Sequence, residues 1–270
     1  RVEEGPVQGW DQPRMPRLGG LRDRAIPAAA VRDFCERAGV AKAQSECDIS
    51  YFEAVVREDL NAGAPRAMAV VEPLKLTLTN YEGSEEVDFD VNQLDPDAGT
   101  RKVLFGKRLY IERGDFSLDP PPKYHRLKIG GYARLKNAYI VRCDEAVTDE
   151  NGNVTEILCT YLPESRSGND TSGVKAKGVL HWVNADTCVD AVLKRYDHLL
   201  RDADYAGQDF SERMNPDSEH LFSAKAEPCL AEAAEGTAFQ LMRTGYYKVC
   251  RDGGKLCLSE IVSLKDNFNK

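Results

Sequence analysis

Residues 137–162 read NAYIVRCDEAVTDENGNVTEILCTYL, two runs rich in β-branched and aromatic side chains on either side of Asn151-Gly152. Asn-Gly between such runs is a strong short-range signal for a β-hairpin, because both residues accept positive φ at little cost. Patches of alternating apolar and polar residues within the runs are typical of strands with one buried face. The stretch therefore predicts a pair of antiparallel strands.

Three further segments have the same β-branched character and are bounded by Gly, Pro, Asn and Asp: residues 68–81, 101–113 and 174–183. Tyr132 to Cys143 continues the pattern just before the hairpin. Many short strands at close spacing indicate barrels or sandwiches. The lack of regular strand–helix alternation argues against a doubly wound parallel sheet.

The first 66 residues have a helical pattern instead. Residues 26–39 carry Pro27 in the first turn and Gly39 after the last, with apolar residues on one face. A second helix is expected over DISYFEAVVREDL, residues 48–60, where Ser50 and Glu53 fit a capping box. NAGAP then ends that helix. The fold class predicted is mainly β with an N-terminal α subdomain.

Composition sets broad limits. With 270 residues, 42% of them hydrophobic, the chain is expected to divide into two or three units. It has no signal-peptide pattern and no apolar run of the ~18 residues that span a bilayer, which predicts a soluble, cytoplasmic protein without a membrane partner. The first residue is Arg, not Met, so we expect a fragment of a longer chain.

The eight cysteines do not form a metal-binding pattern. None belongs to a C-x-x-C pair, and no His lies at zinc-finger spacing from any of them. We expect small buried hydrophobic side chains, and no metal site. Nucleophile and phosphate-binding motifs are absent as well, and clusters such as Glu85-Glu86 have turn-like surroundings, so no catalytic residue is predicted.

One stretch is basic against a net charge of −8: KYHRLKIGGYARLK, residues 123–136. We expect two strands joined at Gly130-Gly131, with cations close together beside aromatic rings. Such a surface suits single-stranded RNA, because cations pair with the phosphates and aromatic rings stack with the bases. The alternative is an ordinary solvated hairpin. The cations of the stretch are Lys123, His125, Arg126, Lys128, Arg134 and Lys136.

Longer strings carry a resemblance to a known family. They are GWDQPRMPRLGGLRDR at 9–24, VREDLNAGAPRAMAVVEPLKLTLTNY at 56–81, KYHRLKIGGYARLKNAYIV at 123–141, KGVLHWV at 177–183, and FQLMRTGYY at 239–247 with VSLKDNFNK at 262–270. In this order they resemble the part of glutaminyl-tRNA synthetases that follows the catalytic domain. The archaeal and eukaryotic glutamyl-tRNA synthetases share the architecture, and the REDLN-x-x-APRAMAV pattern favours the glutaminyl branch.

The resemblance implies a tRNA-binding portion of an ATP-dependent ligase. His-x-Gly-His and Lys-Met-Ser-Lys, the family's ATP-binding motifs, are not present, so this chain alone should be inactive and hold no cofactor. The parent enzyme would use ATP and Mg to attach glutamine to tRNA(Gln). The implied partners are tRNA(Gln) and the missing N-terminal catalytic domain, within a monomer.

The resemblance also assigns residues to the anticodon. Arg66 and Gln240 match the family's contacts to the central uracil, and Arg126 matches the arginine at the third base, a guanine. Arg134 matches the contact to the first base, with Lys136 beside it. Lys123 and His125 belong to the same RNA-binding group, and Lys42 and Gln44 match the segment at the inner corner of the tRNA.

The implied architecture is two anticodon-binding β-barrels after the helical subdomain. The helical subdomain is residues 1–66, the proximal barrel combines 67–115 with 206–270, and the distal barrel is 116–205. Arg66 and Gln240 are expected to converge in the proximal barrel.

Four residues depart from the family pattern: Lys136, His125, Met242 and Glu260. The last two weaken the expected contribution of the C-terminal region. Together with the net acidity, they support an alternative, a β-barrel protein-interaction module that has lost RNA binding. A glutamyl-type synthetase fragment is the other alternative. His181 and Trp182, in KGVLHWV, are interpreted as core residues.

Overall fold

The computed structural model describes residues 9, 11–15, 17–39, 47–200 and 214–264. The chain forms two compact units. Unit 1 contains Arg1–Pro65, Val192–Phe222 and Ala233–Lys270, and unit 2 contains Arg66–Ala191 and Ser223–Glu232. Most of the regular structure is β, with helices near the N-terminus, which confirms the predicted fold class. The four-part domain division stays a prediction.

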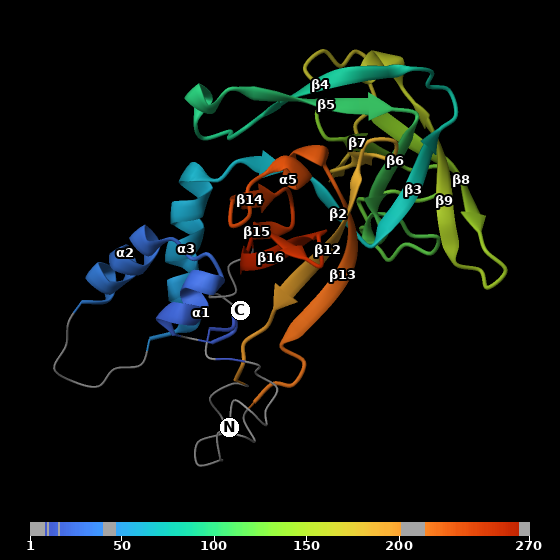
Figure 1. The fold of residues 1–270 in the computed structure, drawn as a ribbon. Coiled ribbons are helices and arrows are strands. Elements are labelled where there is room, and N and C mark those ends of the chain that lie inside the picture. Colours follow the sequence, from blue (N-terminus) through green and yellow to red (C-terminus); the bar gives the residue numbers. More distant parts are fainter. Residues whose placement is uncertain (1–8, 10, 16, 40–46, 201–213, 265–270) are drawn as a thin grey trace. The chain divides into compact units, whose positions relative to one another are not determined.

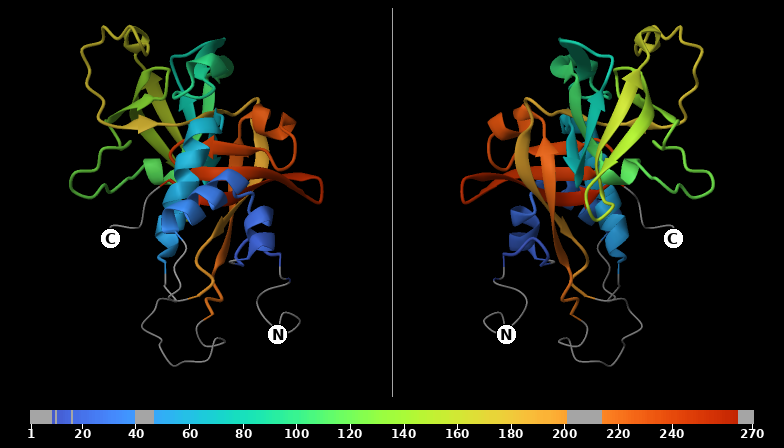
Figure 2. Two further views of the ribbon diagram at one scale, coloured as in Figure 1. Left: turned by 90° about the vertical axis from the view of Figure 1, so that its left-hand side faces the viewer. Right: turned by 90° about the vertical axis from the view of Figure 1, so that its right-hand side faces the viewer.

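Three helices open unit 1: α1 (Leu18–Asp23), α2 (Ala28–Ala38) and α3 (Ile49–Gly63). As predicted, α2 follows Pro27 and ends at Gly39, whose φ of 71° suits a residue without a side chain. α2 packs against α3 (Figure 2), where the rings of Phe34 and Phe52 meet edge to face at 5.0 Å.

The cap of α3 differs from the prediction. Asp48, not Ser50, is the N-cap, and its Oδ1 accepts a hydrogen bond from the backbone N–H of Ser50 at 2.9 Å. Glu53 does not return to the cap. Its carboxylate lies 3.6 Å from His198 Nε2 and 3.9 Å from Arg57 Nη1. The capping-box interpretation was therefore wrong, because the preceding acidic residue and more distant cations compete for the same groups.

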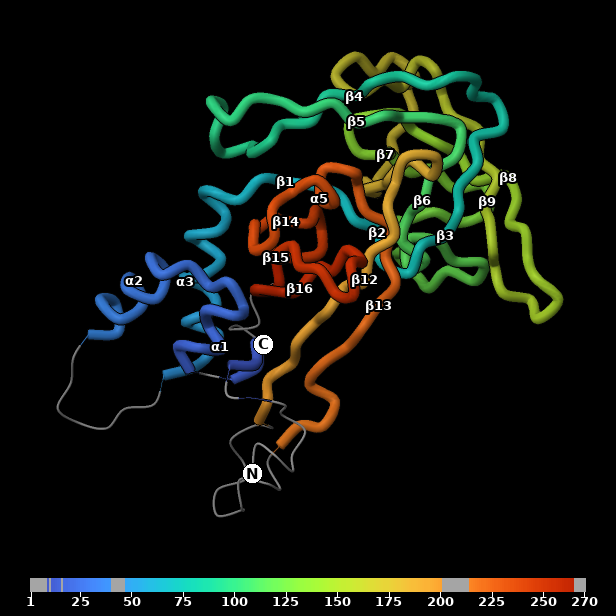
Figure 3. The backbone as a smooth tube through the Cα atoms, viewed as in Figure 1, coloured from blue at the N-terminus to red at the C-terminus, as the bar shows by residue number. Residues whose placement is uncertain are grey.

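The sheet of unit 1 is built from β14 (Ala238–Leu241), β15 (Gly245–Asp252) and β16 (Lys255–Ser263), with residues 192–196 of β12 (Val189–Tyr196) beside β16. β15 and β16 form a long hairpin (Figure 3). One face of α3 buries its apolar side chains against this hairpin. That cluster contains Phe52, Val56, Leu60, Tyr246, Ile261 and Val262.

Unit 2 contains a curled sheet in the order β10-β7-β8-β9-β3-β6-β11 and a separate ribbon of β4 and β5 (Figure 1). The curled sheet comprises β3 (Pro73–Leu78), β6 (Arg108–Glu112), β7 (Tyr132–Leu135), β8 (Ile140–Thr148), β9 (Val154–Tyr161), β10 (Val179–Leu180) and β11 (Val183–Asn184). β13 (Glu219–Ala226) pairs with β2 (Ala69–Val71) through residues 224–226. The remaining strands are β1 (Arg66–Ala67), β4 (Ser84–Asp90) and β5 (Thr100–Gly106). The short helical elements are the 3-10 turns η1 (Pro96–Ala98), η2 (Arg113–Asp115) and η3 (Pro163–Ser165), and the helix α5 (Pro228–Glu232).

The hairpin at Asn151-Gly152 is present. β8 and β9 pair antiparallel on either side of it, and Gly152 has a φ of 81°. At the centre of unit 2, Trp182 is fully buried and its Nε1 donates to the carbonyl of Lys136 at 3.0 Å. His181 is 1% exposed. Both residues are therefore core residues, as their sequence context predicted.

Among the described residues, no helix is long and apolar enough to cross a bilayer. All eight cysteines are free thiols. Two pairs of them face each other across antiparallel strands, Cys143 with Cys159 and Cys250 with Cys257.

Candidate nucleic-acid interface

Leu127 anchors the loop part of the basic segment, residues 123–129, to unit 2. Leu127 is fully buried. Its backbone N–H donates to the carbonyl of Asp115 at 2.9 Å, and its own carbonyl accepts from Ser117 at 3.1 Å. Anchoring at this residue leaves its neighbours, Arg126 and Lys128, exposed.

The predicted two-stranded form of this segment was wrong. Residues 123–129 belong to no strand, while β7 pairs antiparallel with β8 and parallel with β10. Gly130 has a φ of 71° and donates to the carbonyl of Cys143 at 2.7 Å, so the turn leads toward β8. Lys123 also adopts a positive φ, 65°, which breaks any extended run before it begins. The cations therefore lie on a loop followed by a strand.

Arg126 has an exposed side chain that is nevertheless held in place. Its Nε lies 3.2 Å from Asp115 Oδ1, and its Nη1 donates to the carbonyl of Gly114 at 2.9 Å. The Arg126 side chain is 47% exposed, whereas that of Asp115 is 0% exposed. Within the described parts of the chain, Nη2 has no hydrogen-bond partner, so its two protons are available to a ligand.

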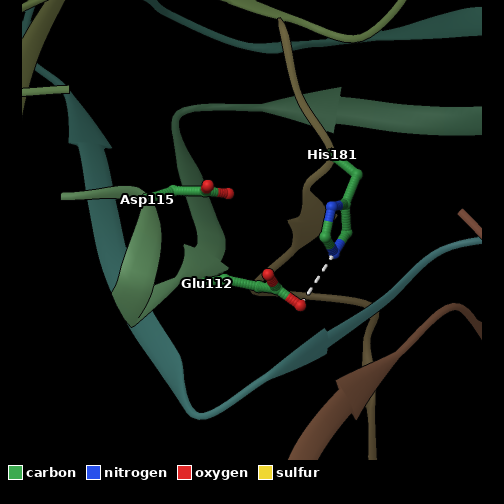
Figure 4. A group of neighbouring side chains, drawn as sticks. All are labelled: Glu112, Asp115 and His181. Atoms are coloured by element: carbon green, nitrogen blue, oxygen red, sulfur yellow. Dashed lines mark ion pairs between the residues drawn. The ribbon is translucent and has the colours of Figure 1, made fainter. Parts of the chain in front are cut away.

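Beneath Arg126 lies a group of three ionisable side chains, Glu112, Asp115 and His181, which Figure 4 shows turned toward one another. One ligand atom of each lies within 4.8 Å of the others, and such a set could hold a cation. However, His181 Nε2 already lies 3.1 Å from the carbonyl of Ala69 and 3.6 Å from Glu112 Oε1. Asp115 pairs with Arg126. These protein contacts account for the arrangement without a metal ion.

The other cations of the basic segment differ in exposure. The guanidinium of Arg134, on β7, donates to the carbonyl of Ser165 at 2.7 Å and pairs with Asp170. Lys136 is partly buried, and its backbone N–H donates to the carbonyl of Leu180 at 2.8 Å. Lys123 and His125 are exposed. Of these cations, Arg126 and Arg134 are each held by a carboxylate and a backbone carbonyl, whereas Lys123 and His125 lie exposed.

Arg66, at the start of β1, is 6% exposed. Its carbonyl accepts from Arg101 Nε at 3.0 Å, and its N–H donates to the carbonyl of Val91 at 2.7 Å. Arg101 in turn pairs with the buried carboxylate of Glu227, whose Oε1 also accepts from the N–H of Met68 at 3.1 Å. Burial raises the pKa of the Glu227 carboxyl, against the lowering effect of Arg101.

Gln240 lies on β14 of unit 1. Its N–H donates to the carbonyl of Pro65 at 2.9 Å. Its buried Oε1 has no hydrogen-bond partner among the described residues. An unsatisfied buried amide oxygen costs about 1–3 kcal/mol, and a ligand that donates a hydrogen bond would remove this cost. Because Arg66 belongs to unit 2, the expected convergence of the two residues stays a prediction.

Two further sequence predictions have different outcomes. Lys42 and Gln44 lie outside the described residues, so their role stays a prediction. Glu260, which departs from the family pattern, is buried in β16, and its Oε2 accepts from the N–H of Tyr196 at 2.9 Å. Its position inside the sheet of unit 1 explains this residue structurally. The sequence did not single out Asp115 or Glu227, because nothing local marks a turn carboxylate as buried.

Comparison with known families gives two matches. Residues 64–162 and residues 179–250 each match a sequence model described as the anticodon-binding domain of class I tRNA synthetases (E and Q). The matched ranges include the basic segment, Arg66 and Gln240.

Curated relatives agree with these matches. The chain is 46% identical to the glutamine–tRNA ligase of Clostridium perfringens over 274 aligned positions, which cover 99% of the chain and 50% of the relative. It is 46% identical to the enzyme of the same name from Rhodopirellula baltica, covering 100% of the chain and 46% of the relative. For Nitrobacter hamburgensis the identity is 43%, with coverages of 100% and 49%. The chain spans about half the length of the curated relatives it matches.

Proposed function

This chain belongs to the family of anticodon-binding domains of class I glutamyl- and glutaminyl-tRNA synthetases, and from that premise we propose that it recognises the anticodon of tRNA(Gln). The whole protein would attach glutamine to this tRNA with ATP and Mg in a catalytic part that the present chain lacks. It would act in the cytoplasm as a monomer. Neither ATP nor metal would bind to the anticodon-reading portion itself.

The observation that carries this proposal is the state of Arg126. Guanine presents two acceptors, O6 and N7, on one edge, and an arginine fork fits them in a planar geometry. Arg126 is exposed, restrained at Nε and Nη1, and free at Nη2 among the described residues. A fixed guanidinium with donors directed away from its protein partners matches a guanine at the third anticodon position.

The remaining roles follow the family assignment. Arg66 and Gln240 would read the central uracil, which offers two carbonyl acceptors and one N–H donor. The unpartnered Oε1 of Gln240 supports an acceptor role toward that N–H. Arg134, with Lys136 beside it, would contact the first base and its phosphate, in competition with Asp170. Lys123 and His125 would add cationic contacts on the exposed loop, and Lys42 with Gln44 would touch the inner corner.

Equilibrium binding to tRNA tests the proposal. A tRNA with the anticodon CUG is compared with two others, one changed at the central U and one at the third-position G. We expect tighter binding to CUG than to either variant. Arg126→Ala should remove about 10-fold to 100-fold of the preference at the third base, the range typical of one bidentate pair.

Arg142 supplies a matched control. Its side chain is also 47% exposed, and its Nε pairs with Asp144 Oδ1 at 2.7 Å in the same unit. Arg142→Ala should leave both base preferences unchanged. Arg66→Ala should lower the preference at the central base, provided that its thermal unfolding shows a folded chain. Equal binding to all three tRNAs by the unaltered chain would contradict anticodon recognition.

Salt dependence provides a second check. If the anticodon loop releases counterions as single strands do, each neutralised phosphate contributes ~0.7 to the slope of log affinity against log salt. A flat response would exclude phosphate-led binding and support a protein-interaction module. Aminoacylation of tRNA by the full-length protein, with glutamine and glutamate compared, distinguishes the glutaminyl from the glutamyl enzyme.

A further inference from the structure

We infer that Asp115 is a positioning residue, which holds the guanidinium of Arg126 in the orientation that reads a guanine; this inference rests on the proposed function. Asp115 ends the 3-10 turn η2, directly after β6, and has no exposed surface. A carboxylate on such a turn is fixed by the sheet behind it. Through this fixed carboxylate, the exposed side chain of Arg126 is held in one position on unit 2.

The attachment is made at two points from adjacent residues. Asp115 binds Nε at 3.2 Å, and the carbonyl of its neighbour Gly114 accepts from Nη1 at 2.9 Å. Two contacts to a planar group determine the direction of its plane as well as its location. The hydroxyl of Tyr124 donates to the same Gly114 carbonyl at 3.3 Å, so the preceding turn of the loop is connected to this point too.

The backbone strengthens the same connection. Leu127, next to Arg126, donates its N–H to the carbonyl of Asp115 at 2.9 Å. The backbone segments that carry Arg126 and Asp115 are therefore hydrogen-bonded to each other, which keeps the two side chains close together. An exposed arginine without such contacts samples many rotamers. Ordering it when a ligand binds costs conformational entropy and lowers the affinity.

The negative charge has a second consequence. A guanidinium that already faces a carboxylate attracts phosphate less strongly than an unpaired one, because the net charge of the pair is near zero. Its remaining donors still form hydrogen bonds with acceptors in the right geometry. Asp115 should therefore favour reading of a base edge over general attraction to the RNA backbone.

This view gives a measurable expectation for Asp115→Asn, which keeps the shape and removes the charge. Preference for a third-position G over A should fall by about 5-fold, the size expected when one rotamer-rich side chain is no longer pre-ordered. Binding to the tRNA with A should stay equal or become tighter. A substitution that only loosened the fold would weaken both tRNAs together.

The experiment measures binding of the full 270-residue chain to tRNA with anticodon CUG or CUA. It uses Asp115→Asn, Arg126→Ala and the double variant. If Asp115 acts through Arg126, Asp115→Asn has no further effect once Arg126 is Ala. Asp144→Asn is the matched control, because it removes the carboxylate that pairs with Arg142 Nε, and its preference should equal that of the unaltered chain.

Three results of the binding experiment would overturn the inference: an unchanged preference in Asp115→Asn, an equal loss for both tRNAs, or a loss that persists in the Arg126→Ala background. A different result bears on the proposed function. If the unaltered chain does not distinguish the two tRNAs, anticodon recognition itself is wrong. If it does distinguish them through Arg126 but not through Asp115, only the positioning role fails.

A measurement without RNA tests the contact between Asp115 and Arg126 directly. The Nε protons of labelled arginines exchange with water at rates that NMR can follow. Asp115 is 0% exposed, so exchange at Arg126 Nε before RNA is added should be slower in the unaltered chain than in Asp115→Asn. Equal exchange rates would show that Arg126 is not held in advance, and would overturn the inference independently.

Discussion

Two carboxylates of unit 2 are almost completely buried, and each holds an arginine, but the two arginines end in different surroundings. Glu227 is 4% exposed and its partner Arg101 is 18% exposed. Asp115 is 0% exposed and its partner Arg126 is 47% exposed. One pair is closed inside the unit, whereas the other is open at its cationic end.

The difference shows in how the donors are used. Arg101 directs Nη1 and Nη2 to Glu227 and Nε to the carbonyl of Arg66, and its guanidinium lies over the ring of Phe89 at 5.3 Å. Arg126 uses Nε and Nη1 and keeps Nη2 for a ligand among the described residues. A buried carboxylate can thus stabilise the fold in one place and present a fixed donor in another.

Arg101→Ala is expected to have the largest effect on stability. It leaves the carboxylate of Glu227 buried without its cation, and breaking such a pair costs about 3 kcal/mol or more. Denaturant unfolding measures the change. Lys102→Ala is the control, since Lys102 is 56% exposed and pairs with the exposed Asp88. An exposed pair contributes below about 1 kcal/mol. Equal losses in both variants would show that burial of the Arg101–Glu227 pair adds nothing to its contribution to stability.

Arg126→Ala should reduce the free energy of unfolding less, by about 1 kcal/mol. Water can replace the exposed guanidinium and hydrate Asp115, which is not possible at Glu227. The same unfolding experiment gives the value. A loss as large as that of Arg101→Ala would mean that the pair of Asp115 and Arg126 mainly stabilises the fold. It would weaken the proposal that Arg126 reads the third-position guanine.

Glu227→Gln sharpens the comparison through pH. Burial raises the pKa of Glu227, so the unfolded chain releases this proton first as pH rises. The contribution of the carboxyl to stability therefore falls from about pH 4 upward, through the raised folded pKa. Relative to the unaltered chain, Glu227→Gln should gain stability over this window. A constant difference between pH 4 and pH 7 would show that Glu227 titrates as an exposed carboxyl does.

The smallest effect is expected in unit 1, where the cation itself can lose its charge. His198 Nε2 lies 3.6 Å from Glu53 Oε1, and the interaction with this carboxylate raises the pKa of His198 above its usual value, against desolvation. The stabilisation is complete below about pH 6.5 and is lost as pH rises through the folded pKa. Since His198 is 54% exposed, it amounts to about 0.5 kcal/mol. His198→Gln should flatten the pH dependence of unfolding between pH 6 and 8, and an unchanged slope would exclude this pair as its source.

Local signals predicted much of the fold. Pro27 and Gly39 bracket α2 as expected, and Asn151-Gly152 forms the turn between β8 and β9, because both features depend on the conformations of a few adjacent residues. The loop at 123–129 was not foreseen. Its alternating cations and apolar residues resemble a strand. However, the backbone of Leu127 is hydrogen-bonded to Asp115 in the turn η2, and residues 123–129 pair with no strand.

The candidate site divides in the same way. The types and order of its cations, Arg66, Arg126, Arg134 and Lys136 above all, could be selected from the sequence by family resemblance, although their contacts to RNA stay predictions. Their states could not. Whether a guanidinium is enclosed by the protein, as in Arg101, or exposed to a ligand, as in Arg126, depends on where its partner carboxylate is buried. No sequence pattern near Glu227 or Asp115 indicates that these carboxylates are buried.

By itself, the sequence determined the family, the mainly β architecture, the N-terminal helices and the location of the basic segment. Turns, helix ends and residue types are local properties, and long matched strings carry family membership. Only the tertiary structure decided that Asp115 lies fully buried beneath an exposed Arg126. The reason is physical: burial and hydrogen bonding arise from segments far apart in the chain, such as 66–69, 112–115 and 181, which meet only after the sheet of unit 2 has curled.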